Sequence, residues 1–167
     1  EDINVRELIQ KMHSHYQGDA MAKRLRLDLD ISARLGVIHV SRLYIEELLQ
    51  NFITNAIKYT DKGSITIIAK RSKDKVRFSV KDTGIGISRG DQVKIFQKFY
   101  RSEDYRIRET NGTGLGLYVS AKLAAKLGTK IDLTSRLNHG STFTFAIPVA
   151  NEGNSKDEDA LQDGPSK

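Results

Sequence analysis

The segment that decides the fold runs from Ser41 to Thr60 and reads SRLYIEELLQNFITNAIKYT. Its apolar side chains recur at steps of three and four, which predicts an amphipathic helix from Ser41, a suitable N-cap, to Tyr59. A second face carries polar residues four positions apart: Glu47, Asn51, Asn55 and Tyr59. A solvated helix side is one interpretation of this face. Asparagine is a poor helix former, however, and its amide oxygen suits a hard cation such as Mg²⁺, so a binding role stays open.

The residues before this helix predict three shorter elements. Residues 4–16 have helical spacing and are expected to form a helix that ends near Gly18. Alternating apolar residues predict a strand over 25–31 and a short second strand over 37–40. We expect residues 1–22 to be the end of an upstream dimerisation helix or linker, residues 23–149 to form the catalytic domain, and residues 150–167 to be a disordered tail.

The residues after the helix predict a sheet built from hairpins. Two alternating runs, 65–69 and 76–80, predict a hairpin whose second strand ends at Asp82. A short helix is expected to start at Ser88 and to carry Val93 and Phe96, and a polar surface loop should follow. A helix over 115–127, ended by Gly128, and strands over 131–135 and 142–147 complete the domain. The fold class is therefore α+β, a mixed and mainly antiparallel sheet with helices on one face.

Composition sets limits on function. The chain has 167 residues, 38% of them hydrophobic and 29% charged, which fits one ordinary globular domain. It has no cysteine, which excludes disulfides and thiolate metal sites, and no apolar run long enough to span a membrane. The net charge of +6 is spread along the chain without a nucleic-acid-binding motif, so we expect no nucleic-acid partner.

Two glycine-rich motifs follow predicted elements. Asp82-Thr83-Gly84-Ile85-Gly86-Ile87 comes directly after a strand, where glycines permit close backbone approach and a carboxylate can accept a hydrogen bond from the amine of adenine. Gly112-Thr113-Gly114-Leu115-Gly116-Leu117 stands where a loop enters a helix, a position suited to anions. Each motif alone is weak: the first is a common turn, and the second could serve tight helix packing. Neither is a dinucleotide fingerprint or a P-loop.

Five segments together carry a more specific pattern. In order and spacing, residues 51–60, 82–87, 96–101, 112–117 and 140–143 resemble the N, G1, F, G2 and G3 boxes of the ATP-binding catalytic domain of sensor histidine kinases. The resemblance spans residues 24–149. It implies the Bergerat fold, a two-layer α/β sandwich in which ATP lies between the helices and a flexible lid.

The same resemblance implies a role for each matching residue. Asn55 is the expected Mg²⁺ ligand, and Asn51, Lys58 and Arg101 are the expected catalytic residues near the phosphates. Asp82 is expected to bind the adenine amine. The full set of expected ATP contacts is Asn51, Asn55, Lys58, Tyr59, Asp82, Gly84, Gly86, Ile87, Tyr100, Arg101, Gly112, Thr113, Gly114, Leu115, Gly116, Leu117 and Thr142.

One position separates the branches of this superfamily. In its ATPases, a glutamate one turn before the Mg²⁺-binding asparagine acts as general base for water, and here that position is Asn51. An amide cannot take a proton from water, so transfer of the γ-phosphoryl group to a prepared acceptor is favoured over hydrolysis. A degenerate nucleotide-binding regulatory module and a superfamily ATPase remain the alternatives.

The phosphate acceptor should be a histidine. His13, His15, His39 and His139 lack the sequence context of the family's acceptor motif, so we expect the acceptor on a separate dimerisation domain of the same protein. The resemblance also implies a downstream response regulator, a cytoplasmic location, and a homodimeric parent protein that a membrane segment could anchor. The isolated fragment is expected to be a monomer.

Overall fold

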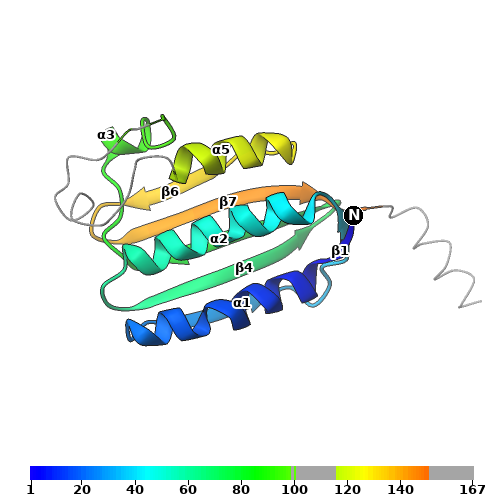
Figure 1. Cartoon of the computed structure of the whole chain (residues 1–167), viewed down its shortest axis with the longest axis horizontal. Coiled ribbons are helices and arrows are strands. Elements are labelled where there is room, and N and C mark those ends of the chain that lie inside the picture. Colours follow the sequence, from blue (N-terminus) through cyan, green and yellow to red (C-terminus); the bar gives the residue numbers. More distant parts are fainter. Residues whose placement is uncertain (99, 101–115, 151–167) are drawn as a thin grey trace, which may run out of the picture.

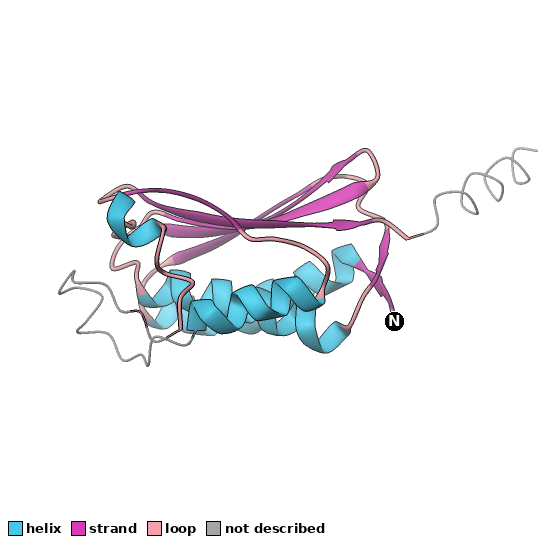
Figure 2. Cartoon of the chain, turned by 90° about the horizontal axis from the view of Figure 1, so that it is seen from above, coloured by secondary structure: helices cyan, strands magenta, loops and turns pink. Residues whose placement is uncertain are grey.

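The computed structural model of the chain describes residues 1–98, 100 and 116–150. Within these residues a five-stranded sheet has the order β2-β4-β5-β7-β6. Three long helices cover one of its faces (Figure 2), which confirms the predicted α+β class with helices on one side. The helices and strands of these two layers are α1 (Val5–Ala22), β2 (Arg26–Ile31), α2 (Arg42–Lys58), β4 (Ser64–Ser72), β5 (Lys75–Asp82), α5 (Gly116–Lys126), β6 (Asp132–Arg136) and β7 (Gly140–Pro148).

Strand pairing in the sheet is mixed. β2 pairs with β4 in parallel, with α2 in the connection between them, while β4–β5, β5–β7 and β6–β7 are antiparallel. The predicted hairpins are thereby confirmed. A second, two-stranded sheet joins β1 (Asp2–Asn4) to β3 (Val37–His39), and the carbonyl of Val37 also accepts a bond from the amide of Ala150 at 2.8 Å. The two ends of the described chain therefore meet at the same edge of the fold (Figure 1).

The core lies between α2 and the centre of the sheet. Phe52 from α2 contacts the rings of Phe143 and Phe145, with centroids 5.3 and 6.0 Å apart, and Phe145 stacks on Phe78 at 5.0 Å. The predicted apolar stripe of α2 is buried throughout, and Ser41 caps the helix by accepting a bond from the amide of Tyr44 at 3.3 Å. α2 is thus fixed by the burial of one face, which leaves its polar face free for other contacts.

The prediction that the first helix ends near Gly18 is wrong. α1 continues to Ala22, because it buries residues along its whole length, including Tyr16 and Ala20. It ends in a Schellman motif in which Leu25 donates to the carbonyl of Ala20 at 2.9 Å, with Arg24 in the left-handed conformation at φ 59°.

α1 shares its core with the sheet. Its buried side chains belong to the same cluster as those of β2, β4 and α2: Val5, Leu8, Ile9, Met12, Tyr16 and Ala20. We therefore count residues 3–22 with the packed unit. That residues 1–22 also end an upstream dimerisation helix stays a prediction.

The helix expected at Ser88 is shorter than predicted. α3 (Arg89–Gln92) has Ser88 as its N-cap and ends before Val93, which is 77% exposed. Beyond Gln92 the backbone forms separate turns, such as the bond from the Gln97 amide to the Lys94 carbonyl at 2.9 Å. Phe96 packs against the core from these turns, with its ring 6.4 Å from that of Phe143. The predicted loop over 101–111 and the predicted tail after residue 150 lie outside the described residues.

Candidate functional site

The polar face of α2 turns toward α5. The amide nitrogen of Asn51 donates to the Ser120 hydroxyl at 3.3 Å, and that hydroxyl donates to the Gly116 carbonyl at 3.0 Å. Ser120 is fully buried, so Asn51 fixes the first turn of α5 against α2. Asn55 lies one turn further along and is half-buried, and in the part of the chain that the structure describes its amide makes no hydrogen bond. Its amide oxygen is thus available to a ligand.

The end of α2 brings a cation and an aromatic ring together. Lys58 and Tyr59 are both half-buried, and the Lys58 ammonium lies 5.5 Å from the centroid of the Tyr59 ring. The ammonium of Lys23 donates to the carbonyl of Ile57 at 2.7 Å, which stabilises the C-terminus of the helix. Lys58 and Tyr59, both predicted ATP contacts, therefore lie at the C-terminal end of α2, which Lys23 stabilises.

Asp82 is the buried carboxylate of the site. It ends β5, is 8% exposed, and its Oδ1 accepts bonds from the Gly84 amide at 2.8 Å and the Ser141 amide at 3.3 Å. Burial raises the pKa of this carboxyl above its ordinary value, and the two backbone amides oppose that shift. A carboxylate kept in such a place at a cost in stability is a candidate for binding a hydrogen-bond donor of a ligand.

The loop after Asp82 fits only glycine at two positions. A methyl group on Gly84 would lie 2.4 Å from the carbonyl oxygen of Tyr59, and one on Gly86 would lie 2.1 Å from that of Arg136. Gly86 also has φ +68°, a conformation that other residues rarely adopt. The loop therefore runs in backbone contact with both the end of α2 and the β6–β7 turn. Ile87 follows it, half-buried against the core, with its amide 2.9 Å from the Ser135 hydroxyl.

Strand alternation places Ser141 and Thr142 on opposite faces of the sheet. β7 directs Phe143 and Phe145 toward the helices, and Ser141 shares their parity, whereas Thr142 pairs with the exposed Lys81. The structure thus brings Ser141 next to Asp82 and does not bring Thr142 there. Sequence reasoning missed Ser141, whose backbone amide donates to Asp82, because the pairing of β7 with β5 could not be fixed from the sequence.

The remaining predicted residues are only partly described. Tyr100 is half-buried, and its hydroxyl donates to the Asp91 carboxylate. Gly116 is the exposed first residue of α5, and Leu117 packs against the core. The other predicted positions lie outside the described residues: Arg101, Gly112, Thr113, Gly114 and Leu115.

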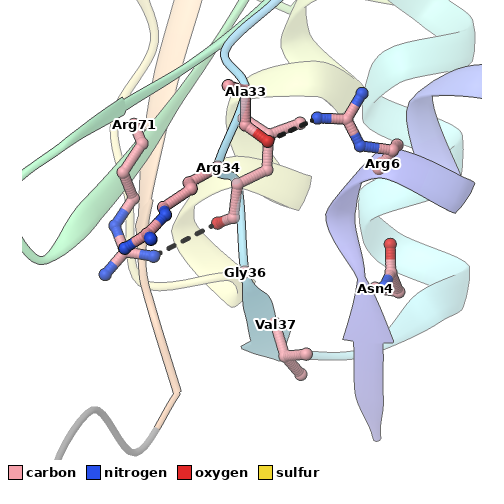
Figure 3. Close-up of a pocket in the computed structure, with 8 residues that line it drawn as sticks. Asn4, Arg6, Ala33, Arg34, Gly36, Val37 and Arg71 are labelled. Carbon is pink, nitrogen blue, oxygen red and sulfur yellow. Dashed lines mark hydrogen bonds between the residues drawn. The ribbon is translucent and has the colours of Figure 1, made fainter. Parts of the chain in front are cut away.

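A hollow at the other end of the domain has a structural explanation. It is lined by three arginines, Arg6, Arg34 and Arg71, and by the segment 33–37 (Figure 3). Arg6 donates to the carbonyls of Ser32 and Ala33 at 2.9 and 2.7 Å, and Arg71 donates to that of Leu35 at 3.4 Å. Two of the three guanidinium groups therefore hold this segment in place.

The structure also bears on metals, histidines and membranes. Among residues 1–98, 100 and 116–150 no three His, Cys, Asp or Glu side chains group into a metal site. His13 lies 2.9 Å from the Leu27 carbonyl, and His39 pairs with Asp2 at 2.8 Å on the surface. No helix in these ranges is long and apolar enough to cross a membrane.

Comparison with known proteins gives consistent matches. Residues 41–151 match the family described as "Histidine kinase-, DNA gyrase B-, and HSP90-like ATPase". The circadian input-output histidine kinase CikA of Synechococcus elongatus is 36% identical over 126 residues, which are 75% of this chain and 17% of that protein. This chain spans between 16% and 38% of the length of the first three curated relatives, all histidine kinases.

The solved structures agree with the sequence matches. Full-length ShkA in complex with AMPPNP superposes with a TM-score of 0.79 and 27% identity, over 89% of this chain and 30% of that one. The catalytic domain of the histidine kinase ThkA gives 0.76 and 29%, over 89% and 96% of the two chains. ThkA in complex with the response regulator protein TrrA gives 0.74 and 26%, over 92% and 42%.

Proposed function

The chain belongs to the histidine kinase-, DNA gyrase B- and HSP90-like ATPase family, and from this premise we propose that it binds Mg-ATP and transfers the γ-phosphoryl group to a histidine on a separate dimerisation domain. It is a catalytic domain of the sensor histidine kinase type used in two-component signal transduction. The observation that carries the proposal is the buried Asp82 carboxylate beside Gly84, at the end of the helix that presents Asn51 and Asn55.

Asp82 is the group that reads the base. Its carboxylate can accept the exocyclic amine of adenine, and a charge-assisted bond in a buried site is stronger than a neutral one. Gly84 and Gly86 let the loop after Asp82 pack its backbone against the end of α2 and the β6–β7 turn, which holds the loop beside the carboxylate. The complex of the similar ShkA with AMPPNP supports an adenine nucleotide as the ligand.

The residues present fit a magnesium ion held together with phosphates. Among the described residues no hydrogen bond occupies the Asn55 amide oxygen. Mg²⁺ in such sites takes one or two protein oxygens and completes its shell with phosphate and water. When bound, the ion would neutralise charge on the phosphates during transfer. Lys58, half-buried one turn after Asn55, would add a positive charge on the same side of α2.

Phosphoryl transfer then depends on positioning. A bond forms between a nitrogen of the acceptor imidazole and the γ-phosphorus as the bond to the β-γ bridging oxygen breaks, which releases ADP. Asn51 cannot act as a base, and it serves to fix α5 through Ser120. Arg101 and the backbone of residues 112–117 are proposed to meet the phosphates; of these, Arg101 and residues 112–115 lie outside the described residues.

The partners follow from the same reaction. The acceptor histidine would lie on the dimerisation domain of a homodimeric parent protein, and the phosphoryl group would pass to a response regulator. The complex of the similar ThkA with TrrA supports a response regulator as the downstream partner. A cytoplasmic position for this domain fits that reaction.

A phosphotransfer assay tests the proposal. The chain is incubated with γ-labelled ATP and Mg²⁺ and with the dimerisation domain of a sensor histidine kinase, and the label should appear on that domain in an acid-labile, alkali-stable form. ATP binding without transfer to the parent protein's own dimerisation domain would favour a regulatory module. Steady phosphate release by the chain alone would favour an ATPase.

A further inference from the structure

Thr60 carries a buried hydroxyl with no partner. It directly follows Tyr59, the C-cap of α2, and is 0% exposed. Of the buried side-chain nitrogen and oxygen atoms in the described parts of the chain, Oγ1 of Thr60 alone lacks a hydrogen bond. An unpaired buried hydroxyl lowers stability, so a valine of the same shape would be preferred if this position served packing only.

The hydroxyl lies beside the groups that surround Gly84. A methyl group on Gly84 would be 2.8 Å from Thr60 Oγ1, 3.0 Å from Asp82 Oδ1 and 2.4 Å from the Tyr59 carbonyl oxygen. These three oxygens therefore converge on one point next to the Gly84 α-carbon. In the described part of the chain no hydrogen bond joins Thr60 to Asp82.

Of the three oxygens, two can only accept hydrogen bonds. The Tyr59 carbonyl already accepts the Ile85 amide at 3.2 Å, and Asp82 Oδ1 already accepts the amides of Gly84 and Ser141. Only the Thr60 hydroxyl carries a proton that it can donate. An ionised carboxylate can accept about four hydrogen bonds, two on each oxygen, and both bonds from the Gly84 and Ser141 amides go to Oδ1. The remaining capacity of Asp82 therefore lies on Oδ2, which can accept one more donor in addition to a ligand amine.

We propose that Thr60 is a positioning residue for Asp82: when an adenine nucleotide binds, the Thr60 hydroxyl donates to the Asp82 carboxylate and holds it toward the exocyclic amine of the base. The contact requires a rotation of one of the two side chains, and the Thr60 hydroxyl and the Asp82 carboxylate lie on the same side of Gly84, each within 3.0 Å of the same point. The inference rests on the proposed function, because it requires that Asp82 reads adenine. It makes Thr60 a determinant of base selectivity without contact to the nucleotide.

Two substitutions at Thr60 test the inference. Thr60→Val keeps the shape and removes the donor, and Thr60→Ser keeps the donor and removes a methyl group. We measure the affinity for ADP and for GDP by calorimetry, and the melting temperature without nucleotide. Thr60→Val should bind ADP about fivefold to tenfold more weakly, the usual effect of one hydrogen bond, with GDP affinity unchanged. Its melting temperature should be equal to or above that of the parent, and Thr60→Ser should keep ADP affinity within about twofold.

The results separate this inference from a packing role. ADP affinity unchanged in Thr60→Val would overturn it, and so would equal losses for ADP and GDP together with a lower melting temperature. A double-mutant cycle adds a second readout: combined with Asp82→Asn, Thr60→Val should cost little further affinity, because the two residues act as one unit. Additive losses would contradict the inference. If the parent chain bound neither nucleotide, the proposed function itself would fail, whereas a parent that binds ADP isolates the question of Thr60.

Discussion

The two ends of the domain bury different kinds of side chain. In the α1 region, formed by α1, β1, β2 and β3, the buried side chains are apolar or aromatic, such as Leu8, Ile9 and Ile38. The Asp82 region is formed by the second half of α2 with Tyr59 and Thr60, the end of β5, residues 83–87, the start of α5 and the start of β7. Here the domain buries four polar side chains: Thr60, Asp82, Ser120 and Ser141. The first region is organised for packing, and the second keeps polar groups that packing alone would not select. Departures from local stability rules of this kind mark functional sites.

The substitution with the largest expected effect destabilises the α1 region and leaves the Asp82 region intact. Leu8 is 1% exposed in the shared core, so Leu8→Ala should lower the free energy of unfolding by about 2–5 kcal/mol. Urea unfolding measures this change, and the exposed Gln10→Ala on the same helix is the matched control. The folded fraction of Leu8→Ala should bind ATP as the parent does. A changed affinity would show that the two regions are not independent.

The substitution with the next largest effect weakens nucleotide binding in the Asp82 region without lowering the stability of the protein. Asn55→Ala removes the proposed metal ligand, so Mg-ATP affinity should fall at least about thirtyfold, or about 2 kcal/mol. Calorimetry with Mg²⁺ and with a chelator measures it, and Gln50→Ala, exposed on the same helix, is the control. Because the Asn55 amide makes no hydrogen bond among the described residues, the melting temperature should hardly change. An equal Mg²⁺ effect in variant and parent would exclude Asn55 as the ligand.

Asp82→Asn should move function and stability in opposite directions. The amide keeps an oxygen for the Gly84 and Ser141 amides but removes a buried charge, so the unliganded protein should be as stable as the parent or more so. Affinity for ATP and ADP should fall alike by about tenfold, because the charge-assisted bond to the amine is lost. Exposed Asp61→Asn is the control. Retained ADP affinity would mean that another group reads the base.

The pH dependence of binding should give the same contrast with a smaller effect. Burial raises the pKa of Asp82, so as the pH is lowered from neutral, ADP affinity should begin to fall at a higher pH than it would for an ordinary aspartate, whose pKa is about 3.9. The stability of the fold should change with pH in the opposite direction to the affinity. Because the pKa of Asp82 is higher in the folded than in the unfolded protein, its protonation stabilises the fold. This stabilisation is complete below the unfolded-state pKa and is lost as the pH rises through the folded-state pKa. Calorimetry from neutral to acid pH tests the affinity, and Asp82→Asn should remove the acid limb.

Sequence patterns predicted the elements that depend on local periodicity. The α2 stripe and the β4–β5 hairpin were predictable because each alternation repeats over many residues. The parallel β2–β4 pairing and the β1–β3 ladder join distant segments, so no local signal specifies them. Gly18 misled the prediction of the helix end, because tertiary burial of Tyr16 and Ala20 outweighs the cost of one exposed glycine.

The candidate site was predictable in its motifs and less so in its geometry. Asn51, Asn55 and Asp82 are where the motifs predict them, on one helix and at one strand end. The face of the sheet on which Thr142 lies could not be predicted, because a one-residue shift in register inverts it. Thr60 carried no signal at all, because an unpaired hydroxyl becomes visible only when its surroundings are known.

The smallest effect concerns strain in the α1 region. Arg24 has φ 59° at the end of α1, where glycine is the preferred residue of a Schellman motif, and its side chain is exposed. Left-handed backbone costs a non-glycine residue about 1–2 kcal/mol, and the greater freedom of glycine in the unfolded chain offsets part of the gain. Arg24→Gly should therefore stabilise the protein by about 0.5–1 kcal/mol in urea unfolding, with ATP affinity unchanged. Arg24→Ala, which removes the side-chain charge and keeps the strain, is the control and should give no gain. Gly84 differs from Arg24 in this respect. A methyl group on Gly84 would lie 2.4 Å from the Tyr59 carbonyl oxygen, so the loop next to Asp82 requires glycine. At residue 24 a non-glycine residue is tolerated, because only the stability of the protein depends on that position. Equal stabilisation by both substitutions at residue 24 would instead assign the effect to the charge of Arg24.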